Sequence, residues 1–206
     1  MRGKFITLEG IDGAGKSTHL RWIARFLRGQ GIRLKVTREP GGTATGEKLR
    51  QLVLKGEQQL HPETETLLMF AARREHLERI ILPALRRGEW VLCDRFTDAT
   101  YAYQSGGSRV AWDKIRILER WVQQGLQPDL TILFDVSPTV GRRRAGGKRR
   151  PDRFEREQEG YYRRVRAAYL RRAAGGGGRI RIVDASGTLT NVKNKLKNIL
   201  PSRYFK

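Results

Sequence analysis

The sequence predicts an α/β fold built on a five-stranded parallel sheet flanked by helices. Five short runs rich in β-branched and aromatic residues have the length of buried strands; they span 4–9, 32–37, 89–93, 130–135 and 179–183. Longer segments with helical periodicity separate these runs, and such alternation is typical of parallel sheets with right-handed crossovers. At 206 residues the chain suits one domain, so we expect a single unit over 1–206.

The helices are predicted from the spacing of apolar residues and from the residues at their ends. Residues 16–29 carry four apolar side chains on one face, and Gly29 ends that helix. Residues 62–87 form a long helix in which Pro83 should introduce a kink or begin the last turn. The other predicted helices span 111–124, 137–145, 154–174 and 188–200.

A phosphate-binding motif follows the first predicted strand. The pattern G-x-x-x-x-G-K-[ST] is matched by Gly10-Ile11-Asp12-Gly13-Ala14-Gly15-Lys16-Ser17, and Thr18 continues the predicted site into the helix. The glycines let backbone N–H groups point at a phosphate, and the helix presents the positive end of its dipole. We expect Lys16 to reach the β- and γ-phosphates and the Ser17 hydroxyl to contact Mg²⁺. The motif therefore predicts binding of a nucleoside triphosphate.

Polar residues also close the second and third predicted strands, at the edge of the sheet where ligands bind in such folds. Asp94 ends the third strand and can hold Mg²⁺ as a Walker-B acid does, although strands also end in Asp for turn formation. Arg95 follows it and suits a second phosphate-bearing substrate. The segment 38–42, Arg-Glu-Pro-Gly-Gly, closes the second strand, and alone it reads equally well as a Pro-Gly turn.

Together these motifs resemble those of the thymidylate kinase family. The resemblance is carried by Asp12 in the P-loop, Thr37-Arg38-Glu39-Pro40-Gly41-Gly42-Thr43, Asp94-Arg95-Phe96 and Ala102-Tyr103-Gln104, and it runs from residue 4 to the turn at 184–186. It implies a P-loop nucleoside monophosphate kinase fold with a mobile lid, and a homodimer. It also implies an enzyme that uses ATP and Mg²⁺ to phosphorylate dTMP to dTDP.

The resemblance implies the residues of a dTMP site. Phe70 would stack on the thymine ring, and Arg74, one helical turn later, would hydrogen-bond to the base edge. Without the other motifs, Phe70 would read as a core aromatic residue. The other implied contacts are Thr100 to the base, Tyr103 to the deoxyribose, Gln104 and Pro40 around the pocket, Arg38 and Arg95 to the acceptor phosphate, and Asp12 beside the sugar hydroxyl. Asp12 could instead simply cap the P-loop.

A lid is expected at 142–153, which is rich in Arg and Gly and nearly devoid of apolar groups. Phosphoryl transfer needs positive charge on the moving group, usually including an arginine. Gly13-Ala14 leaves no arginine in the P-loop, so the resemblance is to the branch of the family with a lid arginine. The candidates are Arg149, Arg150 and Arg153, with Arg153 favoured, while Arg144 would stack on adenine. A solvated charge run is the alternative for any of these arginines.

The chain is strongly basic, with 42 Lys and Arg against 21 Asp and Glu and a net charge of +21. Such a charge attracts polyanions. The basic residues are spread along the chain with a concentration near 142–172, and the sequence has no zinc-finger spacing or basic tail. We therefore favour an enzyme with a basic surface and incidental polyanion binding over a dedicated nucleic-acid binder.

The remaining sequence features favour a cytoplasmic protein without membrane contact. No apolar run approaches the length of a membrane span, and the N-terminus leads directly into the first strand. Cys93, the only cysteine, lies in a predicted strand and is expected in the core.

Two other functions stay open on the sequence alone. One is a kinase for another deoxynucleoside monophosphate, because the motif residues favour a deoxypyrimidine without ranking dTMP over dUMP. The other is a P-loop nucleic-acid-binding or regulatory protein that uses the +21 charge.

Overall fold

A parallel sheet forms the centre of the protein, whose computed structural model describes residues 2–56, 58–146 and 159–200. Its strands are β1 (Phe5–Glu9), β2 (Leu34–Arg38), β3 (Trp90–Asp94), β4 (Leu130–Asp135) and β5 (Ile180–Asp184). They lie in the order β2-β3-β1-β4-β5, and every neighbouring pair is parallel. The five predicted strands are confirmed, with bounds that differ by at most two residues.

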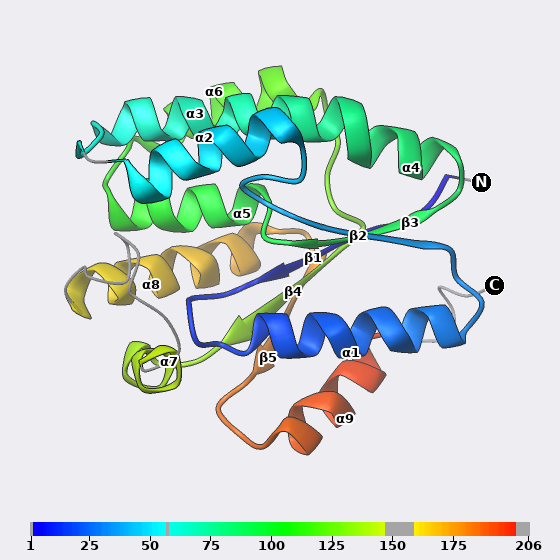
Figure 1. Ribbon diagram of the computed structural model, residues 1–206. Coiled ribbons are helices and arrows are strands. Elements are labelled where there is room, and N and C mark those ends of the chain that lie inside the picture. The colour runs from blue at the N-terminus through cyan, green and yellow to red at the C-terminus, as the bar shows by residue number, and fades with distance from the viewer. Residues whose placement is uncertain (1, 57, 147–158, 201–206) are drawn as a thin grey trace.

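Helices cover both faces of this sheet (Figure 1). The helices after the first two strands are α1 (Lys16–Gly29), α2 (Ala44–Lys55), α3 (Pro62–His76) and α4 (Leu82–Arg86). The later ones are α5 (Thr97–Thr100), α6 (Trp112–Gln123), α7 (Pro138–Ala145), α8 (Glu159–Gly175) and α9 (Leu189–Ile199). Figure 1 shows α1 and α9 below the sheet and α2 to α6 above it. The predicted α/β architecture is confirmed.

The long helix predicted over 62–87 contains a π-helical segment, η1 (Leu77–Ile81), between α3 and α4. Pro83 follows this segment at the start of α4. Its ring cannot donate a backbone hydrogen bond and would clash with the carbonyl of residue 79 in a regular α-helix. The wider turn relieves that clash, so the predicted effect of Pro83 is confirmed.

Two helical regions lie outside the predicted set. The first is α2, which the Thr43 side chain caps by accepting a hydrogen bond from the N–H of Gly46. The second is α5 together with the π-helical η2 (Tyr101–Gly107), which carries two glycines at its end. Glycine lowers helix propensity, and neither segment has a long apolar stripe. Both regions nevertheless bring side chains to the edge of the sheet where the predicted site lies.

The core lies between the sheet and its helices. Phe5, Leu8, Leu92 and Ile132 have no exposed surface, and Cys93 is fully buried among them as predicted. Burial raises the pKa of the Cys93 thiol, so this cysteine stays protonated at neutral pH. Within the described part of the chain, no helix has the length and apolar character needed to cross a bilayer.

Candidate active site

A cavity of about 1140 Å³ opens at the carboxyl edge of the sheet. Its walls come from the P-loop, the segment after β2, the ends of α2 and α3, the segment 94–104, the end of α7 and the turn into α9. Because α3 and α9 lie on opposite faces of the sheet (Figure 1), the cavity extends from one face to the other past the P-loop. A cavity of this extent has room for two ligands.

The P-loop lines this cavity from Asp12 to Thr18. Gly13 has a φ of 78°, and a β-carbon there would collide with the carbonyl oxygen of Gly141 on α7. The Lys16 ammonium donates to the carbonyls of Gly10 and Ile11 at 2.9 and 3.0 Å. Burial, together with the nearby Arg95 guanidinium, lowers the pKa of Lys16 to about 8.

Gly10 and Ile11 differ from the other predicted residues of the motif because they do not line the cavity. A β-carbon on Gly10 would collide with the carbonyl oxygen of Phe134, so this glycine permits close packing between the loop and β4. The Ile11 side chain is 3% exposed and belongs to the core. Their contribution is structural, through the two carbonyls that hold Lys16.

Asp12, Arg95 and Tyr103 contact one another on the cavity wall. Arg95 Nη2 donates to Asp12 Oδ1 at 2.6 Å and to the Tyr103 hydroxyl at 2.9 Å. The Arg95 guanidinium also lies over the Tyr103 ring, 4.6 Å from its centroid. The sequence predicts these three residues at one phosphoryl-transfer site, and the structure brings them into direct contact. They come from the β1–α1 loop, the β3–α5 connection and η2.

Asp94, at the end of β3, and Ser17, the last residue of the P-loop motif, line the same cavity. The Asp94 Oδ1 atom is buried and has no hydrogen-bond partner among the residues that the structure describes. A buried carboxylate oxygen without a partner is unfavourable unless a ligand satisfies it. A hydroxyl and a carboxylate oxygen are also the donor types that Mg²⁺ prefers, so these two residues fit the predicted metal.

The structure corrects the predicted contacts to the base. Phe70 is 2% exposed and packs in the core, and Arg74 is 42% exposed and pairs with Glu78 at 2.8 Å. The cavity is lined by Met69 and Arg73 instead. These residues lie four positions apart on α3 and therefore share a face, which is displaced by one residue from the predicted pair.

Arg73 is fixed on the cavity wall by polar and aromatic partners. Its Nε donates to Glu39 at 2.8 Å and its Nη2 to Thr100 at 3.0 Å. Its guanidinium lies 4.7 Å from the Phe70 ring centroid and 5.0 Å from that of Phe96. Phe70 thus supports the arginine rather than a ligand. The buried Nη1 has no hydrogen-bond partner within the described residues, so it is a donor available to a ligand.

The remaining predicted residues on this side do line the cavity: Arg38, Pro40, Thr100, Tyr103 and Gln104. Gln104 donates to Glu65 at 3.0 Å, which fixes its side chain against α3. Arg38 forms two hydrogen bonds with Glu47 at 2.9 and 2.8 Å. Arg50, which no motif indicated, also lines the cavity and donates to the Pro40 carbonyl at 3.0 Å.

Arg144 lies on the other side of the P-loop, near the end of α7. It donates to the carbonyls of Ala185 and Ser186, both at 2.7 Å, and lines the cavity. The first residues of the predicted lid, 142–145, complete α7. The three other arginines proposed for the lid, Arg149, Arg150 and Arg153, lie outside the described residues.

Several cavity residues were not predicted from the sequence. They include His19, Arg21, Arg50, Leu54, Met69, Arg73, Arg143 and the residues of the turn 185–192 that line the cavity. The sequence feature that could have indicated Arg73 is its spacing along the helix. His76 lies three positions after it, and the two residues share a buried face with Phe70. The turn 185–192 has no local chemistry that distinguishes it from a surface loop.

Comparisons with known proteins agree with this geometry. A protein-family model described as "Thymidylate kinase" matches residues 8–196. The chain is 60% identical to a thymidylate kinase of Nitrosomonas europaea over 199 residues, covering 97% of this chain and 93% of the relative. It is 56% identical to one of Nitrosospira multiformis over 204 residues, covering 99% and 100%.

A solved structure agrees as well. The crystal structure of thymidylate kinase from Ehrlichia chaffeensis superposes with a TM-score of 0.78 at 32% identity, covering 97% of this chain and 99% of that one. The matches extend over nearly the whole chain and include both sides of the cavity. This chain belongs to the thymidylate kinase family.

Proposed function

We propose that this chain transfers the γ-phosphoryl group of ATP to dTMP and so produces dTDP and ADP. The observation that carries the proposal is a single cavity that joins the P-loop to a pocket formed by Met69, Arg73 and Tyr103. Family membership supports the same reaction. Phosphoryl transfer requires a donor and an acceptor that are aligned in one site, and this cavity offers places for two nucleotides in these roles.

ATP occupies the side of the cavity formed by the P-loop and α7. The N–H groups of the loop and the start of α1 surround its phosphates, with Lys16 beside the transferred group. Arg144, held by the carbonyls of residues 185 and 186, contacts the adenine. The arginine that the P-loop lacks stays a prediction from the sequence, with Arg153 as the favoured residue.

The acceptor occupies the side formed by α3, α5 and η2. Arg73 Nη1 donates to a carbonyl of the base, and Met69 packs on its ring with Pro40 and Leu54 nearby. Thr100 and Gln104 complete the pocket, and Tyr103 lies against the deoxyribose. Arg95 binds the monophosphate, aided by Arg38 and Arg50, while Asp12 orients Arg95.

Mg²⁺ would be held by Ser17 and Asp94 together with phosphate oxygens of the nucleotide. The unpartnered Oδ1 of Asp94 supports this assignment. No group of three or more His, Cys, Asp or Glu side chains suited to a metal occurs among the described residues, which fits an ion that arrives with its nucleotide. When bound, the ion supplies positive charge to the phosphates.

The side chains around the transfer path act through position and charge. The acceptor monophosphate is already an oxyanion at neutral pH, so no residue has to act as a strong base. Lys16 and Arg95 stabilise the charge that develops on the transferred group and its neighbours. Because Asp12 and Tyr103 hold Arg95 in place, its guanidinium needs little reorganisation during the reaction.

A homodimer is the assembly that we propose, with α2, α3 and α6 as the contact surface. Large apolar side chains are exposed on these three helices: Leu52, Leu67, Ile117 and Trp121 at 48%, 54%, 57% and 74%. Such a concentration of exposed apolar residues is typical of protein interfaces. The +21 charge gives the surface an incidental affinity for polyanions. The cytoplasmic location expected from the sequence stays a prediction.

A substrate panel tests the function and its rivals together. The purified chain is assayed for ADP release from ATP and Mg²⁺ with dTMP, dUMP, dGMP and dCMP, and DNA binding is measured at several salt concentrations. We expect dTMP to give the highest kcat/KM. If another monophosphate gave the highest kcat/KM, that monophosphate would be the acceptor. No turnover combined with tight, salt-sensitive DNA binding would favour the nucleic-acid-binding alternative.

A further inference from the structure

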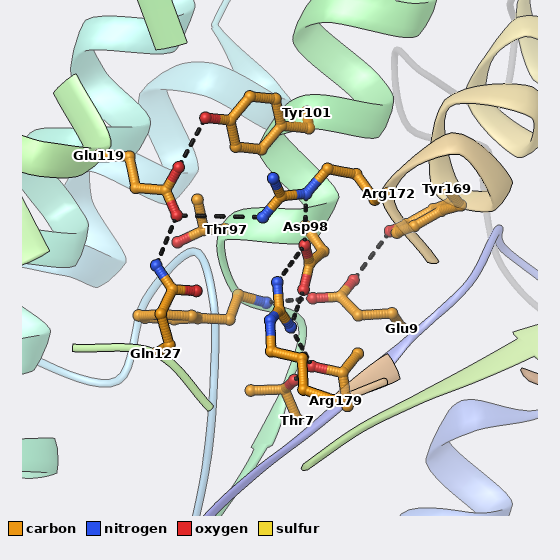
Figure 2. Close-up of polar contacts among 12 residues, drawn as sticks. Thr7, Glu9, Thr97, Asp98, Tyr101, Glu119, Gln127, Tyr169, Arg172 and Arg179 are labelled. Atoms are coloured by element: carbon orange, nitrogen blue, oxygen red, sulfur yellow. Dashed lines mark hydrogen bonds and ion pairs between the residues drawn. The ribbon is translucent and has the colours of Figure 1, made fainter. Parts of the chain in front are cut away.

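Glu9 holds Arg95 from two directions although Glu9 itself does not line the cavity. Its side chain is fully buried at the end of β1. One carboxylate oxygen accepts from the N–H of Phe96, the residue after Arg95, at 2.7 Å. The other accepts from the Tyr169 hydroxyl at 2.9 Å (Figure 2), and Arg95 Nη1 donates to that hydroxyl at 3.3 Å. Glu9 thus fixes both the backbone beside Arg95 and the phenol that its guanidinium contacts.

The backbone of Arg95 needs this support. Its φ of 68° lies in the left-handed region, which residues other than glycine seldom adopt. Such a conformation persists only where surrounding interactions hold it. The Arg95 N–H donates to the Leu8 carbonyl at 2.9 Å, and the next N–H donates to Glu9. Both peptide groups that flank the strained residue are therefore bound to β1.

An ion pair between α8 and α5 holds the helix that carries Tyr169, and an arginine just before β5 shares the same carboxylate. Arg172 follows Tyr169 by one turn of α8 and donates from Nε to Asp98 at 2.8 Å. Arg179 donates to both oxygens of the same carboxylate, at 2.8 and 2.9 Å. Figure 2 shows the two guanidinium groups converging on Asp98, close to Glu9 and Tyr169. Because Asp98 lies three residues after Arg95, the Arg172–Asp98 ion pair ties the helix of Tyr169 to the segment that carries Arg95.

We propose that Tyr169 and Glu9 are positioning residues that orient Arg95 toward the acceptor phosphate, an inference that rests on the proposed function. Nη2 of Arg95 is bound by Asp12 and Tyr103, and Nη1 is bound by Tyr169. The guanidinium therefore has partners on both amino groups. An arginine that is fixed before the substrate arrives keeps the geometry that in-line transfer requires.

Two tyrosine-to-phenylalanine variants separate positioning from stability. Tyr169→Phe removes the hydroxyl that links Arg95 to Glu9. Tyr101→Phe is the matched control, because its buried hydroxyl donates to the Glu119 carboxylate at 2.6 Å without contacting Arg95. We expect Tyr169→Phe to lower kcat/KM for dTMP by about tenfold or more, with the KM for ATP nearly unchanged. We expect Tyr101→Phe to retain both values.

A double variant shows whether Tyr169 acts through Arg95. If it does, adding Tyr169→Phe to Arg95→Lys will cause little further loss, because the oriented guanidinium is already absent. An equal loss in the Tyr169 and Tyr101 variants, or an undiminished effect of Tyr169→Phe in the Arg95→Lys background, would overturn the inference. The proposed function is tested separately by whether the wild type turns over dTMP at all. The positioning role is tested by how much each variant lowers kcat/KM relative to the wild type.

Discussion

Arg73 and Glu39 form a buried ion pair, with Nε and Oε2 2.8 Å apart and both side chains less than 5% exposed. Burial alone would raise the pKa of Glu39, but Arg73 and His76 outweigh it and hold the pKa below its ordinary value. The pair therefore fixes a charged guanidinium at the cavity wall, beside the segment that follows β2. This arrangement distinguishes Arg73 from its neighbour Arg74, whose side chain is exposed.

Replacing each of these adjacent arginines tests which one contacts the base. Arg73→Ala leaves the buried Glu39 without its main partner, so we expect a loss of about 3–5 kcal/mol in the free energy of unfolding. We also expect weaker dTMP binding by tenfold or more, measured by calorimetry in a variant that remains folded at low temperature. Arg74→Ala is the control and should change neither value appreciably. Weaker binding in Arg74→Ala alone would restore the original prediction for this helix.

The contact between the P-loop and α7 leads to a second prediction. Gly13→Ala places a methyl group against the Gly141 carbonyl at a residue whose φ is 78°. Either α7 or the P-loop must move, so we expect ATP binding measured by calorimetry to weaken by tenfold or more. Gly29→Ala is the control, since no atom lies within 4 Å of its β-carbon position. It should preserve binding and add about 0.4–1 kcal/mol of stability.

The P-loop and the sheet could be predicted from the sequence because their signals are local. Gly13, Gly15 and Lys16 stand at fixed spacing after an apolar run, and the strands are short runs rich in β-branched and aromatic residues. The choice between Arg73 and Arg74 depended instead on the rotation of α3, which tertiary packing sets. Arg50 reaches the cavity from a helix without a strong apolar pattern. Its position follows from how α2 packs on α3, and no local signal records that.

Lys16 is expected to be essential for turnover without being essential for the fold. Among the described residues, its ammonium donates to the carbonyls of Gly10 and Ile11 and lies 4.0 Å from the Asp12 carboxylate, all within its own loop. Lys16→Ala should therefore change the melting temperature little while abolishing ADP formation. Lys4→Ala is the control: Lys4 is 42% exposed and lies 3.7 Å from Asp129, at the opposite end of β1. Near-normal kcat in Lys16→Ala would contradict the assigned role.

Glu9 should make stability fall as the pH rises. Burial, together with the nearby Asp98 carboxylate, raises the pKa of Glu9 from 4.5 to about 8. Between these two values the folded state binds the proton that the unfolded state has released, so the free energy of unfolding declines with increasing pH. The stabilisation that the protonated Glu9 adds to the free energy of unfolding is fully present below about pH 4.5 and is lost by about pH 8.

Glu9→Gln provides the comparison, because it keeps the shape of the side chain and removes its titration. We expect urea unfolding to show the wild type losing stability relative to Glu9→Gln between pH 5 and 8, with a slope of at most about 1.4 kcal/mol per pH unit. Other titrating groups cancel in the difference between the two proteins. A difference that stays constant over this range would show that Glu9 is ionised in the folded protein.

The proposed dimer surface makes the last prediction. Trp121 is 74% exposed and lies four residues after Ile117 on α6, so both side chains project from one face of that helix. Trp121→Lys places a charge in the proposed contact and should convert the dimer to a monomer in sedimentation velocity experiments. Ile182→Lys is the matched control, because Ile182 is 49% exposed on the edge strand β5, away from α2, α3 and α6. A dimer that survives Trp121→Lys but dissociates in Ile182→Lys would move the interface to the edge of the sheet.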